Sequence, residues 1–152
     1  MLGVGSASLS LLHSTPTSPV GSVLDLGTGS GVQLLGQLDS AERIVATDVH
    51  ERALDLARAT VAAADATQRV DLRSGSWFEP VAGERFDRIV ANPPFVVGLP
   101  EVGHVYRDSG LNLDGASELV VSQVTEHLNP GGTAHLLAAW VHQGEAVSYT
   151  HL

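Results

Sequence analysis

The stretch that most restricts how this chain can fold is a short apolar run that ends in three alternating glycines. Residues 22–26 read Ser-Val-Leu-Asp-Leu, and Gly27, Gly29 and Gly31 follow at every second position. Such a run is typical of a strand that is buried on both faces of a parallel sheet. Glycines directly after it allow the backbone to approach a ligand closely, because they carry no Cβ and tolerate positive φ angles. The segment therefore predicts a ligand-binding turn between a strand and a helix.

The remainder of the chain alternates between predicted strands and predicted helices. Further strands are expected at residues 43–47, 69–73, 85–91 and 133–140. Helices are expected after Gly31, over residues 51–64, from residue 114 to about 128, and briefly near residues 9–12, and the turn at residues 129–132 should end the third of these. This alternation predicts an α/β fold with a doubly wound, mostly parallel sheet and right-handed crossovers. In such a sheet a ligand binds at the carboxyl ends of the strands, here between the first and fourth strands.

The composition indicates one globular, cytoplasmic domain and argues against several kinds of partner. The 152 residues are 43% hydrophobic and 16% charged, which suits a single soluble domain with its own core. A formal charge of −9 does not attract phosphate backbones, so a nucleic acid substrate is disfavoured unless another domain supplies basic residues. Cysteine is absent and the histidines show no paired metal spacing, so no metal site is expected. No apolar run is long enough to cross a membrane, and no signal peptide is evident.

The spacing of acidic residues and glycines bears on which cofactor the turn would bind. A dinucleotide site requires G-x-G-x-x-G/A, and a match that starts at Gly27 and Gly29 places Val32 at the third glycine, which is a poor fit. Asp48 ends the second predicted strand, 23 residues after Asp25. A carboxylate there is able to accept both ribose hydroxyls of a bound nucleoside, or alternatively to cap the helix that follows.

A second motif, Asn92-Pro93-Pro94-Phe95, follows the fourth predicted strand. Its residue types suit a reaction that transfers a group to an amide or amino-aromatic nitrogen. The lone pair of such a nitrogen is delocalised, so the nitrogen is a poor nucleophile. Two acceptors that hold the two hydrogens of this nitrogen, the Asn92 side-chain oxygen and the Pro93 carbonyl, would favour the transition state. The prolines fix φ and remove competing donors, and Phe95 offers a face for a planar target. The alternative interpretation is a strand end that is closed by a proline-rich turn.

Taken together and in this order, the two motifs and Asp48 resemble the S-adenosylmethionine-dependent methyltransferases that modify planar nitrogen atoms. These include the release-factor glutamine-N5 methyltransferases and related small-domain methyltransferases with an NPPF or NPPY motif. The resemblance implies a Rossmann-like methyltransferase core and S-adenosyl-L-methionine as cofactor, because the acidic-x-Gly-x-Gly-x-Gly pattern of the family is matched in full. The residues it assigns to the cofactor are Asp25, Gly27, Thr28, Gly29, Gly31, Asp48, Val49, Ser76, Trp77 and Asn92, and those it assigns to catalysis are Asn92, Pro93, Pro94 and Phe95.

Two of these assignments, Ser76 and Trp77, depart from the family pattern or leave an alternative open. Ser76 stands where the family often has an aspartate that holds the adenine amino group, and a neutral hydroxyl is a weaker acceptor. Trp77 is expected either to cover the adenine or to be an ordinary core or rim aromatic. Val49 would line the adenine pocket beside Asp48.

The resemblance also implies a domain organisation and a class of acceptor. We expect one domain over residues 1–152, with a pre-strand segment 1–19, a core 20–140 and a short tail 141–152. The family normally adds two more strands, so the chain is expected to be truncated before them. The expected acceptor is a protein glutamine of the release-factor type, and the runner-up is a base amino group in rRNA, tRNA or DNA. Rivals from other classes are a NAD-dependent oxidoreductase and a non-catalytic cofactor-binding module.

Overall fold

The structure is a computed structural model that describes residues 5–93 and 115–138. Its strands are β1 (Val20–Leu26), β2 (Ala41–Asp48), β3 (Val70–Ser74), β4 (Phe86–Ala91) and β5 (Leu128–Leu136). Its helices are α1 (Ser6–Ser14), α2 (Val32–Gln37), α3 (Glu51–Ala63) and α4 (Gly115–Gln123), with 3-10 turns at η1 (Glu79–Val81) and η3 (Val124–His127). No helix within these two ranges is both long and apolar enough to cross a bilayer.

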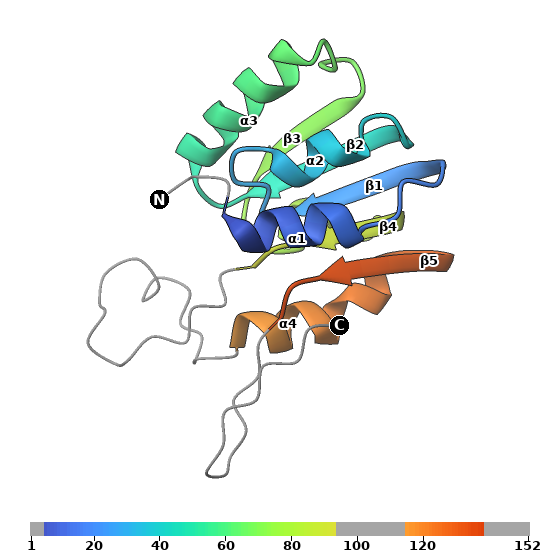
Figure 1. The fold of residues 1–152 in the computed structure, drawn as a ribbon. Helices are drawn as coiled ribbons and strands as arrows, with labels where there is room; N and C mark the ends of the chain where they lie inside the picture. The colour runs from blue at the N-terminus through green and yellow to red at the C-terminus, as the bar shows by residue number, and fades with distance from the viewer. Residues whose placement is uncertain (1–4, 94–114, 139–152) are drawn as a thin grey trace, which may run out of the picture.

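The strands form one sheet in the order β3-β2-β1-β4-β5, and every neighbouring pair is parallel. Figure 1 shows α1, α2 and α3 together on one side of the sheet, whereas α4 lies near β5 on the other. The prediction of a doubly wound parallel sheet is therefore confirmed. Because β1 pairs with β2 on one side and β4 on the other, the strand order reverses at the carboxyl end of β1.

Both faces of the central strands are buried, which explains their nearly continuous apolar sequences. Val23 and Leu24 are neighbours in β1, and both are completely buried, yet they belong to different core clusters. Val23 packs with Leu11 and Leu34 beneath the helices α1 and α2. Leu24 packs with residues of η1, β4 and α4 on the opposite face. Successive side chains of a strand point to opposite faces, so two cores favour apolar residues at successive positions.

The predicted bounds of the first four strands agree with the structure to within a few residues, but those of the fifth are wrong. The expected strand at residues 133–140 begins earlier, at Leu128, and the preceding α-helix ends at Gln123, followed by η3. Residues 129–132 do break the regular pattern, because the pairing with β4 moves from Phe86↔Leu128 to Arg88↔Thr133. The strand also ends earlier than expected, because β5 stops at Leu136 and residues 137–138 are not in a strand. Residues 139–140 of the expected strand, and the expected loss of two later strands, concern segments outside the described residues.

Gly132 explains how the chain makes this irregularity and still stays beside β4. A Cβ placed on Gly132 would lie 2.9 Å from the carbonyl oxygen of Asn129 and 3.0 Å from that of Phe86. The neighbouring Gly131 has a φ of +79°. The Asn129 side chain donates a hydrogen bond of 2.8 Å to Asp87 on β4. The sequence of Asn129, Gly131 and Gly132 predicted a turn, but these residues form a bulge within β5. Glycine is required at position 132 because the backbone of β4 lies so close.

Candidate functional site

The structure brings the two sequence motifs together at the carboxyl end of the sheet. Leu26 at the end of β1 pairs with Ala91 at the end of β4, so Gly27 and Asn92 follow adjacent strands. Figure 1 shows the arrowheads of β1 and β4 pointing to the same edge. This edge is the point where the strand order reverses, which is where ligands bind in doubly wound sheets. The sequence had predicted this junction as the ligand site.

The three glycines of the turn serve two different purposes. All three have positive φ angles, +71° at Gly27, +57° at Gly29 and +86° at Gly31. A Cβ at Gly27 or Gly29 would meet no atom within 4 Å, so the space in front of these two residues is open. A Cβ at Gly31 would lie 3.1 Å from Leu34 and 3.3 Å from Thr60. The first two glycines therefore leave room for a ligand, whereas the third allows α2 and α3 to pack closely.

Asp25 ties the turn to the helix that follows it. Its side chain is 1% exposed, and its Oδ2 accepts hydrogen bonds of 2.6 Å from the Thr28 hydroxyl and 3.1 Å from the Leu34 amide. The pKa of Asp25 is raised to about 6, mainly by burial and in small part by the charge of Asp48, and the two hydrogen bonds oppose this rise. Its Oδ1 is buried and has no hydrogen-bond partner among the described residues. An orphaned carboxylate oxygen is an acceptor available to a donor or cation.

Asp48 at the end of β2 supports the turn from its other side. Its Oδ2 accepts a hydrogen bond of 2.9 Å from the Gly29 amide, and its Oδ1 accepts one of 2.9 Å from His50. The alternative role as helix cap is wrong, because the N-cap residue of α3 is His50, which makes no side-chain cap bond. Each carboxylate oxygen has two lone pairs, so both retain capacity for a further donor. The adjacent Val49 is 60% exposed.

The turn after β3 lies next to Asp48. The amide of Gly75 donates a 3.1 Å hydrogen bond to the carbonyl oxygen of Asp48, which places Ser76 and Trp77 at the same edge of the sheet. Trp77 is partly buried against the core cluster that contains Phe78, and it has a φ of +48°. Positive φ is unfavourable for a bulky residue and is often found at functional sites. The indole therefore has a structural contact already, and its predicted contact with adenine stays a prediction.

Asn92 is held by Ser8 on α1. Its Nδ2 donates a 2.9 Å hydrogen bond to the Ser8 hydroxyl, whereas its Oδ1 is buried and without a partner in the described ranges. Pro93, the next residue, is buried. Pro94 and Phe95 lie outside the described residues. One of the two predicted acceptor atoms is thus an unpaired oxygen at the edge of the sheet where the strand order reverses.

A further buried group, Arg88 on β4, also escaped the sequence analysis. It is 2% exposed, and burial lowers the pKa of its guanidinium. The guanidinium donates to Gln37 Oε1 at 2.7 Å and to the Ser18 carbonyl and hydroxyl, both at 3.0 Å. The only signal in the sequence is a charged residue within an apolar strand. Arg88 joins β4 to the end of α2 and to the segment before β1, away from the glycine turn.

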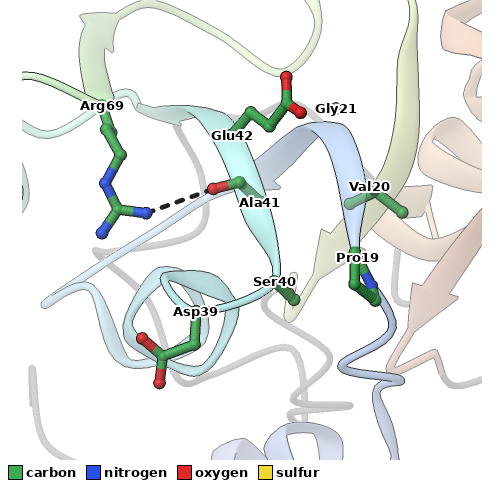
Figure 2. Close-up of a pocket in the computed structure, with 8 residues that line it drawn as sticks. All are labelled: Pro19, Val20, Gly21, Asp39, Ser40, Ala41, Glu42 and Arg69. Atoms are coloured by element: carbon green, nitrogen blue, oxygen red, sulfur yellow. Dashed lines mark hydrogen bonds between the residues drawn. The ribbon is translucent and has the colours of Figure 1, made fainter.

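Two hollows on the described surface lie elsewhere. One, of about 450 Å³, is at the opposite end of the sheet, where β1 and β2 begin. Figure 2 shows its lining residues and the Arg69 guanidinium, which donates a 3.4 Å hydrogen bond to the Ala41 carbonyl. Another, of about 540 Å³, is lined by residues around Phe78 and His127. Neither is lined by a residue of the glycine turn or by Asn92, so both are separate from the site described above.

The parallel sheet, the glycine turn with acidic residues on both sides, and the asparagine after β4 are features of the Rossmann-like methyltransferase fold. Residues 3–145 match the methyltransferase small domain family, and the chain belongs to this family. The fold and the resemblance predicted from the sequence are thereby confirmed. Membership in a methyltransferase family also confirms S-adenosyl-L-methionine as the cofactor.

Individual relatives agree with this assignment. The chain is 35% identical over 151 residues to a release factor glutamine methyltransferase of Cereibacter sphaeroides, covering 91% of this chain and 53% of that protein. It is 37% identical over 139 residues to the enzyme of the same name from Xylella fastidiosa, covering 82% and 49%. The chain thus spans about half the length of these curated relatives. The structure of the T. thermophilus 16S rRNA N2 G1207 methyltransferase in complex with AdoMet and guanosine is similar at a TM-score of 0.67 and 25% identity, over 90% of this chain and 35% of that one.

Proposed function

We propose that this chain transfers a methyl group from S-adenosyl-L-methionine to a planar nitrogen, and that the acceptor is the side-chain amide of a protein glutamine. The observation that carries the proposal is the buried, unpaired Oδ1 of Asn92 at the carboxyl edge of the sheet. An unpaired buried acceptor is costly unless a donor is supplied from outside the chain. The N–H of an acceptor amide is such a donor.

The residues around the glycine turn fit the cofactor. The orphaned Oδ1 of Asp25 suits the ammonium group of the methionine part, directly or through water. The open space before Gly27 and Gly29 accommodates the methionine chain, because no Cβ intrudes. Asp48 has acceptor capacity for the ribose hydroxyls, and the exposed Val49 offers an apolar surface for adenine. When bound, S-adenosyl-L-methionine supplies an electrophilic methyl group on its sulfonium.

The chain's own contribution to the reaction is mainly to position the acceptor nitrogen. Asn92 Oδ1 accepts one N–H of the target, and the Pro93 carbonyl accepts the other. Both hydrogen bonds strengthen as the nitrogen becomes tetrahedral, so they favour the transition state over the ground state. Holding the nitrogen in line with the methyl group removes much of the entropic barrier. No charged base is required, since the proton is able to leave later to water. Pro94 and Phe95 keep their predicted roles as a rigid turn and a stacking face.

The choice of glutamine over a nucleobase rests on relatives and on charge. The two curated relatives above are named as release factor glutamine methyltransferases. The rRNA methyltransferase among the structural neighbours favours the alternative, a base amino group. The formal charge of −9 opposes a polyanionic partner, so a release-factor-like protein is the preferred acceptor. A cytoplasmic location stays a prediction.

A transfer assay with an Asn92→Ala variant tests the proposal. The chain would be incubated with S-adenosyl-L-methionine and a glutamine-bearing release-factor peptide, and methylation would be read by mass spectrometry. We expect Asn92→Ala to abolish transfer and to spare cofactor binding, measured by calorimetry, because Asn92 is only one of several residues assigned to the cofactor. Gln123→Ala, which removes an exposed amide on α4, is the control and should behave as the unchanged chain.

Each other result has a definite meaning. Loss of transfer and binding together in Asn92→Ala would contradict the division between cofactor and acceptor residues. Methylation of an RNA oligonucleotide but not of the peptide would favour the base amino group. Cofactor binding without transfer to either acceptor would favour a non-catalytic binding module, and protection by NAD alone in a thermal shift would revive the oxidoreductase.

A further inference from the structure

Ser8 is the residue on which the acceptor side and the cofactor side of the site converge. Its hydroxyl accepts the 2.9 Å hydrogen bond from Asn92 Nδ2, across 84 residues of sequence. Its backbone carbonyl accepts a 2.7 Å hydrogen bond from the Nε2 of Gln33. Gln33 is 5% exposed and lies in the first turn of α2, directly after the glycine turn. Figure 1 shows α1, which carries Ser8, lying close to α2 and to the end of β4.

The contact matters because the two ends of an asparagine amide are similar in shape and opposite in hydrogen-bonding character. The oxygen only accepts, and the NH₂ group only donates. A target N–H requires the oxygen, so the amide must not rotate to present its NH₂ group. A serine hydroxyl is able to donate or to accept, and in this structure the Ser8 hydroxyl accepts from the Nδ2 end, so that the Oδ1 end is the one left unpaired.

Ser8 is in turn held in place. Gln33 anchors its carbonyl, and the side chain is half-buried, whereas Ser6 and Ser10 on the same helix are exposed. Leu11, one turn further along α1, is 2% exposed within the core cluster beneath α1–α3. The hydroxyl therefore belongs to a packed helix and is not a mobile surface group.

We propose that Ser8 is a positioning residue for methyl transfer, which orients the Asn92 amide so that its Oδ1 meets the acceptor nitrogen. The proposal rests on the function proposed above for Asn92. Through Gln33 the same serine also fixes the acceptor oxygen relative to the helix that starts at the cofactor turn. Ser8 itself touches neither the cofactor nor the acceptor in this scheme.

The first test reads the amide directly and requires no activity. In the ¹⁵N-labelled 152-residue chain, the side-chain amide signal of Asn92 is identified by its absence in Asn92→Ala, among the signals of the three asparagines and of the glutamines. We expect Ser8→Ala to shift this signal and to accelerate its exchange with water. Ser8→Thr, which keeps the hydroxyl, and Ser10→Ala, an exposed serine of the same helix, should leave it in place. An Asn92 signal unchanged by Ser8→Ala would overturn the proposal.

The second test uses the peptide transfer assay. Ser8→Ala should lower kcat roughly five- to tenfold, the effect expected for one net hydrogen bond, with the KM for S-adenosyl-L-methionine unchanged. Ser8→Thr should restore kcat, and a general structural defect would instead lower thermal stability and cofactor binding together. Full activity of Ser8→Ala, or loss of activity with loss of cofactor binding, would overturn the positioning role. If the unchanged chain methylates no acceptor but the amide signal responds to Ser8→Ala, the function proposed above fails while the contact stands.

Discussion

The raised pKa of Asp25 predicts an unusual dependence of stability on pH. The side chain is 1% exposed, and burial raises its pKa from 3.8 to about 6. A carboxyl with a higher pKa in the folded protein than in the unfolded chain binds its proton more tightly when folded. Its stabilisation is complete below pH 3.8 and is lost as the pH rises through about 6. Ionised Asp25 therefore weakens the fold at neutral pH.

The magnitude follows from the two pKa values. One pKa unit corresponds to about 1.4 kcal/mol, so the change from 3.8 to about 6 corresponds to about 3 kcal/mol in the free energy of unfolding. About half of this, roughly 1.4 kcal/mol, should appear between pH 7 and pH 5. Asp25→Asn removes the titration and keeps an oxygen for Thr28 and Leu34. We expect the stability of the unchanged chain to rise relative to Asp25→Asn by that amount as the pH falls from 7 to 5.

Urea unfolding of both chains at pH 7 and pH 5 measures the effect. The comparison between chains cancels the titration of every other group, so only the change in their difference is interpreted. Asp87→Asn is the control, because hydrogen bonds from Asn129 and Ser22 lower the pKa of Asp87 and its titration falls below this pH range. A stability difference for Asp25→Asn that stays the same at both pH values would refute the reasoning.

Two further substitutions test the bulge and the cofactor turn. Gly132→Ala should destabilise the chain by about 1–3 kcal/mol in urea unfolding, because the added methyl group would press on the carbonyl oxygens of Asn129 and Phe86; a neutral result would show that β5 is able to move away from β4. Asp48→Ala should weaken binding of S-adenosyl-L-methionine at least tenfold in calorimetry, because it removes the acceptor for ribose and the bond that holds Gly29; unchanged affinity would contradict the ribose assignment.

The central strands could be predicted because burial on both faces leaves a direct mark on the sequence. Val23 and Leu24 enter different cores, so two neighbouring positions of β1 are both apolar. The start of β5 could not be predicted in the same way. The segment Asn129–Gly132 has the composition of a turn, and only the backbone of β4 beside it makes it a bulge.

The site shows the same division between local and distant information. The glycines, Asp25 and Asp48 follow strand ends at fixed spacings, so their meeting at one edge follows from the sheet topology. The contact of Ser8 with Asn92 joins residues 84 positions apart, and a serine within a short helix carries no mark of it. The contacts of Arg88 are likewise long-range. The sequence shows that Arg88 lies within a strand, but it does not show which polar groups surround the guanidinium.

Those polar groups give Arg88 a consequence for folding. Ser18, Gln37 and Ser40, which accept its hydrogen bonds, all precede it by 48 residues or more. The hydrogen-bond acceptors for the guanidinium are therefore synthesised well before β4. A shift of β4 by one residue along β1 would turn Asp87 or Ile89 toward these acceptors and leave the guanidinium unpaired. The buried arginine thus favours a single register of β4 on β1. This register also sets the position of Asn92 relative to the glycine turn.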